Sequence, residues 1–174
     1  ISITGVLGYA TKGEEKVFGD SAYSTIAEEI AEAKGARGIM FHANSPGGAA
    51  VGNIELATEA ASTGLPTAAW VTGMGCSACY ALIAGADRIA AQPSAIVGSI
   101  GTIMPLLDMS GFWDSLGVKP DYVQSGDLKA AGYMPSQTPE ERAALQEEVD
   151  DLGEMFRAHV TRFRAIGPQA MRGQ

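Results

Sequence analysis

The chain has 174 residues, of which 46% are hydrophobic, so it is long and apolar enough to bury one sizeable core. Its formal net charge of -8 argues against nucleic-acid binding, because that affinity depends largely on clustered Lys and Arg. No run approaches the roughly 20 uninterrupted apolar residues of a membrane-spanning helix. We therefore expect a single domain over residues 1–174, and the start at Ile1 without Met suggests a fragment of a longer chain.

Short apolar runs alternate with helical patterns along the first half of the chain. This alternation predicts an α/β fold with a mainly parallel sheet flanked by helices. The expected elements are a strand over 1–7, a loop over 8–20, a helix capped by Ser21 or Ser24 and ended by Gly35, a buried strand over 38–43, a tight turn over 45–48, a helix over 49–62, a strand over 67–71 and a small-residue helix over 77–84.

The second half begins with short strand candidates and ends in a long helix. The expected elements are strands over 88–91, 95–97, 102–104 and 119–123, a helix over 110–116, a loop over 125–137 and a helix from Pro139 toward Arg164. Thr138 predicts the start of this helix as an N-cap, with Pro at the first helical position and Glu141 at the third. Apolar residues from Leu145 to Phe163 keep helical spacing, so the helix is expected to pack by one stripe.

Ser77 is a candidate nucleophile. A hydroxyl nucleophile needs exposure at a sharp turn, a base, and donors for the oxyanion that forms. Ser77 has the first, because an apolar strand breaks through Gly73 and Gly75 before a helix of small residues. A side chain there stands at a helix N-terminus, where backbone amides favour negative charge. An ordinary N-cap serine is an equally acceptable interpretation of the local pattern.

Gly47 and Gly48 form a second candidate feature, between a buried strand and a helix. Residues without side chains can bring their amides close to a ligand carbonyl, which suits an oxyanion hole. A plain strand-to-helix turn is the more common explanation of such a pattern taken alone.

The base is harder to assign from the residues alone. His42 lies inside a predicted strand and His159 shares the packing stripe of the last helix, so both are expected to be structural. Lys129 stands in a loop among small apolar residues, where partial burial would favour the neutral amine that accepts a proton. A solvated loop lysine is the commoner alternative.

Cys76 and Cys79 form a CxxC pair around Ser77. Such a pair is typical of a thiol redox site or of half a metal site. The residues between the cysteines are not those of a redox motif, and His42 and His159 do not supply a second pair of zinc ligands. We therefore expect two buried packing thiols and no metal.

Several motifs follow one another in order along nearly the whole chain. They are the 45–48 turn SPGG, the 76–80 segment CSACY, the 86–89 segment ADRI, the 93–101 segment PSAIVGSIG, and Ser125, Gly126 and Lys129 ahead of the Thr138 helix start. This order resembles the signal peptide peptidase A family of serine peptidases. The resemblance implies a Clp/crotonase-like α/β fold, with a mainly parallel sheet flanked by helices and a long C-terminal helix.

The resemblance also implies a role for individual residues. It makes Ser77 the nucleophile and Lys129 the general base, with Ser99 placed to hydrogen-bond the lysine amine. The implied oxyanion amides are those of Ala78 and of Gly47 or Gly48. The reaction is then acyl transfer through an acyl-enzyme, which needs no metal or organic cofactor.

The residues after the nucleophile point to one branch of the family. Signal peptide peptidases usually have Gly there, whereas Ala78 and Cys79 are more similar to the head maturation proteases of tailed phages. The resemblance implies a prohead protease that cuts scaffold and capsid proteins in the host cytoplasm or procapsid. The alternative is a membrane-associated signal peptide peptidase that degrades leader peptides. Half-length members form rings, so we expect a homo-oligomer in which Ser77 and Lys129 meet between subunits.

Two other function classes compete with a peptidase. A crotonase-like acyl-CoA enzyme shares the fold, but it needs a different base and an adenine-nucleotide pocket that this acidic chain does not indicate. A non-catalytic scaffold would keep the fold without retaining Ser77, Ser99 and Lys129 together.

Overall fold

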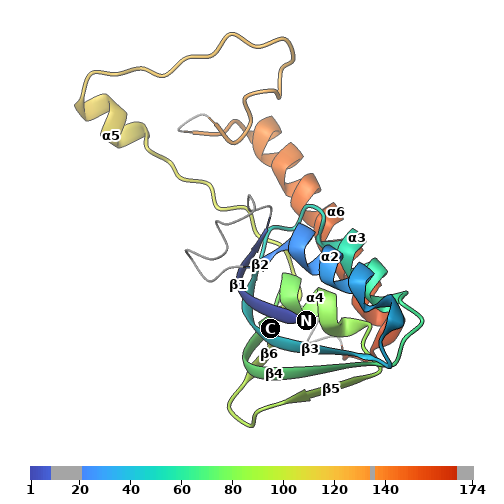
Figure 1. Cartoon of the computed structure of the whole chain (residues 1–174). Helices are drawn as coiled ribbons and strands as arrows, with labels where there is room; N and C mark the ends of the chain where they lie inside the picture. The colour runs from blue at the N-terminus through green and yellow to red at the C-terminus, as the bar shows by residue number, and fades with distance from the viewer. Residues whose placement is uncertain (9–20, 134–135, 168–174) are drawn as a thin grey trace. The chain divides into compact units, whose positions relative to one another are not determined.

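The computed structural model describes residues 1–8, 21–133 and 136–167. Every strand pairing in it is parallel, in the order β2-β1-β3-β4-β5 with β6 paired to β4 (Figure 1). The strands are β1 (Ser2–Gly8), β2 (Ser21–Ala22), β3 (Ile39–Gly48), β4 (Thr67–Cys76), β5 (Arg88–Ala91) and β6 (Ile96–Gly98). The predicted α/β class with a parallel sheet is confirmed.

Helices alternate with the strands from β2 to β5, as the sequence predicted for the first half of the chain. They are α2 (Tyr23–Glu32), the 3-10 turn η1 (Ala33–Gly35), α3 (Asn53–Ala61), α4 (Ala78–Ala84), α5 (Ser110–Ser115) and α6 (Pro139–Phe163). In Figure 1, α2, α3 and α4 lie on the same side of the sheet, where α4 packs against β3 and β4. None of the helices within the described ranges is long and apolar enough to cross a membrane.

The long helix α6 begins as predicted. The Thr138 N–H donates to Glu141 Oε2 at 2.8 Å, and the Glu141 N–H donates to Thr138 Oγ1 at 3.2 Å. This is the reciprocal capping box that the sequence indicated. Phe156 and Val160 are buried in the core on the packing stripe of the same helix.

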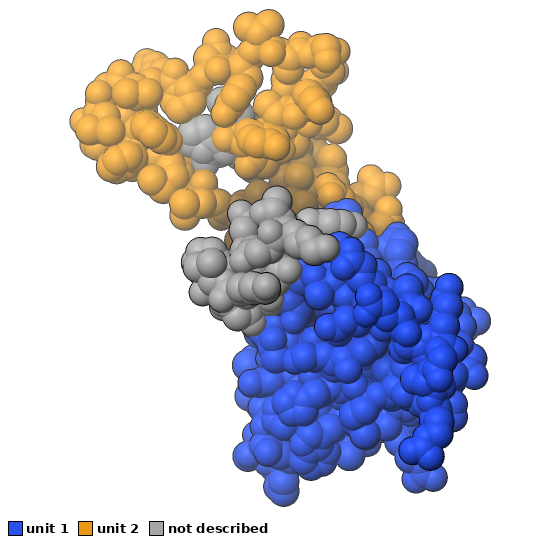
Figure 2. Space-filling view, in the orientation of Figure 1, with its two compact units in different colours: residues 1–101, 153–174 blue, residues 102–152 orange. Residues whose placement is uncertain are grey.

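The chain divides into two compact units (Figure 2). Unit 1 comprises residues 1–101 and 153–174, and unit 2 comprises residues 102–152. Unit 1 holds the apolar core, in which Ile3, Phe41 and Val71 are almost fully buried. Among the described residues of unit 2, only Ala130 and Glu141 are buried, so unit 2 has no core of its own.

One face of the sheet in unit 1 is exposed. Residues of β3 alternate between buried and exposed, and Met40 is 56% exposed. Trp70 of β4 is partly exposed on the same face, because it is the register partner of the exposed His42. The prediction of a buried strand over 38–43 is therefore wrong for alternate residues, because the helices cover only the other face of the sheet.

Several predicted boundaries also differ from the structure. β3 continues through the expected 45–48 turn, and α3 begins only after it. The N-cap of α2 is Ala22 rather than a serine, since the Ser21 Oγ accepts the Thr4 N–H at 2.9 Å. The stretches 102–104 and 119–123 form no strand in the described part of unit 2, because no neighbouring strand pairs with them. Most of the predicted 8–20 loop lies outside the described residues.

Candidate active site

Ser77 lies on a sharp turn between the end of β4 and the start of α4. Its backbone has φ 51° and ψ -125°, an unusual conformation for a residue with a side chain. The turn is held by the Ser77 N–H, which donates to the Gly98 carbonyl at 2.8 Å. Ser77 is the N-cap residue of α4, but its side chain makes no capping hydrogen bond, unlike that of an ordinary N-cap serine.

Ser99 is the second strained serine of unit 1. In the described part of the chain, Ser77 and Ser99 are the two residues other than glycine with a positive φ, and that of Ser99 is 54°. Ser99 follows Gly98, whose carbonyl accepts the Ser77 N–H. The backbones of both serines are thus linked where β6 pairs with the end of β4. Strained residues of this kind cluster at active sites.

Gly47 brings the end of β3 directly against the Ser77 turn. Gly47 has φ 109°, and a Cβ added to it would lie 2.6 Å from the Ser77 Cβ and 3.1 Å from the Ala78 nitrogen. No side chain fits between these two segments, which explains the glycine. The Gly47 N–H donates to the buried Ser45 Oγ at 3.1 Å, so this amide is already engaged.

Ala78 is the first residue of α4, where a backbone N–H has no acceptor within the helix. The Ala78 carbonyl accepts a hydrogen bond of 3.0 Å from the side-chain amide of Asn53, which is buried in α3. This bond ties the first turn of α4 to the neighbouring helix. The structure therefore brings four of the predicted site residues together in unit 1: Ser77, Ala78, Gly47 and the backbone of Ser99.

Lys129 belongs to unit 2, in a series of turns where its N–H donates to the Gly126 carbonyl at 3.0 Å. Ala130 beside it is buried, but the Lys129 side chain is exposed. Its own loop therefore does not provide the partial burial that the sequence suggested. The pairing of Lys129 with Ser77 stays a prediction.

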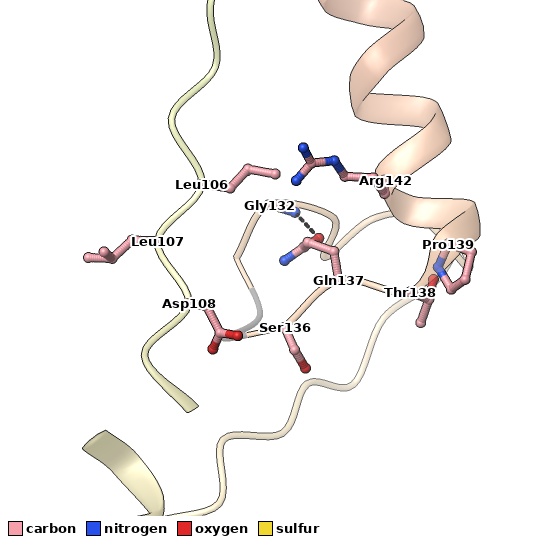
Figure 3. Close-up of a pocket in the computed structure, with 9 residues that line it drawn as sticks. All are labelled: Leu106, Leu107, Asp108, Gly132, Ser136, Gln137, Thr138, Pro139 and Arg142. Carbon is pink, nitrogen blue, oxygen red and sulfur yellow. Dashed lines mark hydrogen bonds between the residues drawn. The ribbon is translucent and has the colours of Figure 1, made fainter. Parts of the chain in front are cut away.

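Unit 2 also contains a pocket that sequence reasoning missed (Figure 3). Its volume is about 390 Å³, and the Gly132 N–H closes one side by donating to Gln137 Oε1 at 2.8 Å. Hydrogen bonds from the hydroxyl and N–H of Ser110 lower the pKa of the Asp108 carboxyl in its wall. The pocket contains none of the predicted site residues. Of its lining residues, Thr138 and Pro139 had a sequence signal, as the start of the last helix.

The interpretation of His159 as structural agrees with its surroundings. His159 is buried in α6, and its Nε2 lies 3.1 Å from the Ala81 carbonyl of α4. Burial lowers the pKa of His159, and the nearby charge of Arg162 lowers it further, against the hydrogen bond to Ala81. His159 and Arg164, which donates to the Ala86 carbonyl, thus tie α6 to the end of the helix that follows Ser77.

Cys76 and Cys79 are both buried and form no disulfide. Burial, and to a smaller extent the nearby Cys76, raises the pKa of Cys79 to about 12, against a hydrogen bond with Ser45 that lowers it. The Cys76 thiol donates to the Ile96 carbonyl at 3.4 Å. Within the described ranges, no group of three or more His, Cys, Asp or Glu residues is placed to hold a metal ion.

A strained serine between a strand and a helix, closely faced by a glycine, is typical of hydrolases that attack an acyl group with a serine. The chain belongs to peptidase family S49, because the sequence model of that family matches residues 59–173. The match includes Ser77, Ser99 and Lys129. It confirms the predicted family and is consistent with the Clp/crotonase-like fold.

Individual relatives support the same assignment. A protein from Enterococcus faecium, whose name provisionally assigns it as a signal peptide peptidase SppA, is 31% identical over 99% of this chain and 52% of its own length. The head-tail preconnector protein GP5 of Enterobacteria phage P21 is 25% identical over 99% of this chain and 36% of its own length. Protease 4 of Salmonella typhi is 28% identical over 82% of this chain and 24% of its own length. The chain therefore spans about half or less of the length of these relatives.

Proposed function

We propose that this chain is the peptidase domain of a serine endopeptidase, with Ser77 as nucleophile and Lys129 as general base. The strained turn that presents Ser77 against the Gly47 backbone carries the proposal. Membership of family S49 supports a peptidase over a crotonase-like acyl-CoA enzyme. The joint presence of Ser77, Ser99 and Lys129 argues against a non-catalytic scaffold.

The proposed reaction is acyl transfer. A neutral Lys129 amine takes the proton from Ser77 Oγ, which then forms a bond to the peptide carbonyl carbon. The C–N bond breaks, and the amine product leaves with the proton that Lys129 returns. Water hydrolyses the acyl-enzyme by the same route, while the Ser99 hydroxyl holds the lysine amine.

Two backbone amides would stabilise the oxyanion of this reaction. The Ala78 N–H is suitable because it begins α4 without an intrahelical acceptor. Of the two glycines left open by the sequence, Gly48 is the better candidate, because the Gly47 N–H already donates to Ser45 Oγ. We therefore propose Gly48 and Ala78 as the oxyanion donors.

Replacement of the nucleophile tests this function. Ser77→Ala should lower peptide hydrolysis by more than about a thousandfold, because a nucleophile and its base work as a unit. A fluorophosphonate probe should label Ser77 stoichiometrically in the unmodified protein and fail to label the variant. Ser62→Ala is the matched control, since Ser62 is exposed at the end of α3. Normal hydrolysis by folded Ser77→Ala protein would refute the assignment.

We also propose that the working enzyme is a homo-oligomer with sites shared between subunits. Unit 2, which carries Lys129, exposes large apolar side chains such as Ile103 at 91%. The open sheet face of unit 1 exposes Met40 and Trp70, so one chain has two apolar surfaces that a second copy would cover. Unit 2 has ten acidic and three basic residues, whereas unit 1 has ten acidic and nine basic residues. Because unit 2 is strongly negative, charge repulsion disfavours contact between two copies of unit 2.

Mixed assembly tests the shared site. Ser77→Ala and Lys129→Ala proteins, each inactive alone, should regain part of the activity when they are unfolded together and reassembled. Light scattering must find oligomers, and mass spectrometry of the intact assembly must find mixed ones. A monomer in solution, or mixed oligomers without activity, would overturn the shared site and leave the roles of Ser77 and Lys129 standing.

For the biological role we propose a phage prohead protease that cuts scaffold and capsid proteins. Ala78 and Cys79 after the nucleophile, and the match of 99% of this chain to the phage P21 protein, support this role. The 31% identity to the Enterococcus faecium protein favours a signal peptide peptidase as the second candidate. Incubation with a phage scaffold protein and with cleaved signal peptides separates the two. Cleavage of signal peptides alone would reject the prohead role.

A further inference from the structure

The strand that leads to Ser77 changes its neighbour part-way along. Residues 68–71 of β4 pair with β5, whereas residues 74–76 pair with β6. Against β3 the register shifts at the same place, since Ala43 pairs with Val71 but Ser45 pairs with Gly75. Two steps along β3 therefore correspond to four along β4, and the extra residues form a bulge immediately before the nucleophile turn.

Asn44 lies opposite this bulge and fills it. Its Oδ1 accepts the Met74 N–H at 3.1 Å, which gives the bulged strand a partner for a backbone donor. A Cβ added to Gly73 would lie 2.5 Å from the same oxygen. The Asn44 side chain thus occupies the space where a side chain at position 73 would be. This contact explains why position 73 is a glycine although its φ is not positive.

Ser45, the next residue, faces the buried side of the sheet and is fully buried. Its Oγ donates to the Gly5 carbonyl of β1 at 2.6 Å and accepts the Gly47 N–H at 3.1 Å. Ser45 thereby fixes the glycine segment, while Asn44 fixes the strand that delivers Ser77. The two segments approach within van der Waals contact at Gly47 and Ser77.

We propose that Asn44 and Ser45 are positioning residues that set the distance between the Gly47–Gly48 segment and Ser77. Neither side chain needs to touch substrate, because each acts through the backbone that it holds. Loss of either bond would let one segment move relative to the other, and a displacement of about 1 Å at a reacting group can cost a hundredfold in rate. The inference rests on the proposed role of Ser77 as nucleophile.

Two substitutions at Asn44 test the acceptor. Asn44→Leu removes it at similar size and should lower kcat by about 10- to 100-fold with little change in KM, because the reacting groups are misplaced. Asn44→Asp keeps an acceptor oxygen and should recover kcat to within about threefold of the unmodified protein. Ser77 labelling by a fluorophosphonate should slow in Asn44→Leu and recover in Asn44→Asp. Thr58→Val is the control, since Thr58 also makes one exposed side-chain hydrogen bond to the backbone, but its hydroxyl donates to the Ile54 carbonyl within α3.

Epistasis between Asn44 and Gly73 gives an independent test. Gly73→Ala should push the Asn44 side chain aside and lower kcat as Asn44→Leu does. In an Asn44→Ala background the same Gly73→Ala change should cost no further activity, because the obstructing oxygen is gone. Additive losses, or equal kcat in Asn44→Leu and unmodified protein, would overturn the proposal. If Ser77→Ala were itself active, the proposed function would fall instead.

Discussion

Units 1 and 2 differ in whether a buried core holds their proposed site residues in place. Unit 1 buries a core between its sheet and helices, and this core fixes the strained turn of Ser77 against Gly47. Unit 2 buries almost nothing in its described part, and the Lys129 side chain is exposed there. The proposed nucleophile is thus positioned by the fold of unit 1, whereas the proposed base is exposed in unit 2. Substitutions in the two units should therefore separate chemistry from stability.

The largest effect is expected from unit 2 and should be chemical alone. Lys129→Ala should lower peptide hydrolysis by more than about a thousandfold, because it removes the proposed general base for Ser77. Thermal unfolding should be unchanged, since the side chain is exposed. Lys129→Arg should be equally inactive, because a guanidinium does not deprotonate. Lys119→Ala is the control, and activity in Lys129→Ala would remove unit 2 from the reaction.

In unit 1, a single substitution near Ser77 should lower both the peptidase activity and the stability of the fold. Gly47→Ala places a Cβ against Ser77 at a positive φ, so it should abolish activity and lower the free energy of unfolding by about 1–3 kcal/mol. Gly64→Ala is the matched variant, because Gly64 has φ 71° but open space around it. It should cost about 1 kcal/mol and leave kcat unchanged. Equal kcat in both variants would show that the approach of Gly47 to Ser77 is unimportant.

The core of unit 1 should also respond to pH through His159. Burial lowers the pKa of His159 from its ordinary value of 6.5, so the folded protein binds fewer protons than the unfolded chain around that pH. The contribution of the neutral His159 side chain to the free energy of unfolding is fully present above pH 6.5 and is lost as the pH falls below that value toward the folded pKa. Urea unfolding at pH 7.5 and 5.5 should detect the loss. His159→Phe should weaken this pH dependence, and an unchanged dependence would contradict the assignment.

The smallest effect is expected from the two thiols near Ser77. Replacing Cys76 and Cys79 together by Ala should cost about 1 kcal/mol for the small cavity that remains. Activity should stay independent of reductant, because burial raises the pKa of both thiols and keeps them unreactive. Peptide hydrolysis with and without a dithiol reagent measures this. Strong activation of the unmodified protein by the dithiol would make the pair a redox site.

Local signals in the sequence predicted local structure well. Thr138, Pro139 and Glu141 indicated a helix start, and the reciprocal hydrogen bonds of Thr138 and Glu141 are present. The break before Ser77 indicated a turn, which the structure has in a strained form. Motif order gave the family, which the match over residues 59–173 confirms.

Features that depend on distant pairing were missed. The sequence gives no sign that β4 pairs first with β5 and then with β6, because this change depends on where β5 and β6 lie. The stretch 119–123 has strand-like residues, yet it has no partner in the described structure. Only the open face of β3 had a visible sign, since polar His42 and Asn44 alternate with apolar Phe41 and Ala43.

The exposed position of Lys129 on a unit without a core has a consequence for how activity scales with amount. With a site shared between copies, dilute chains would be inert, and specific activity would rise with protein concentration as subunits associate. The protease would then need no removable pro-segment to stay silent after synthesis. Crowding many copies into a confined volume would itself be the signal to begin cutting, and dispersal would end it.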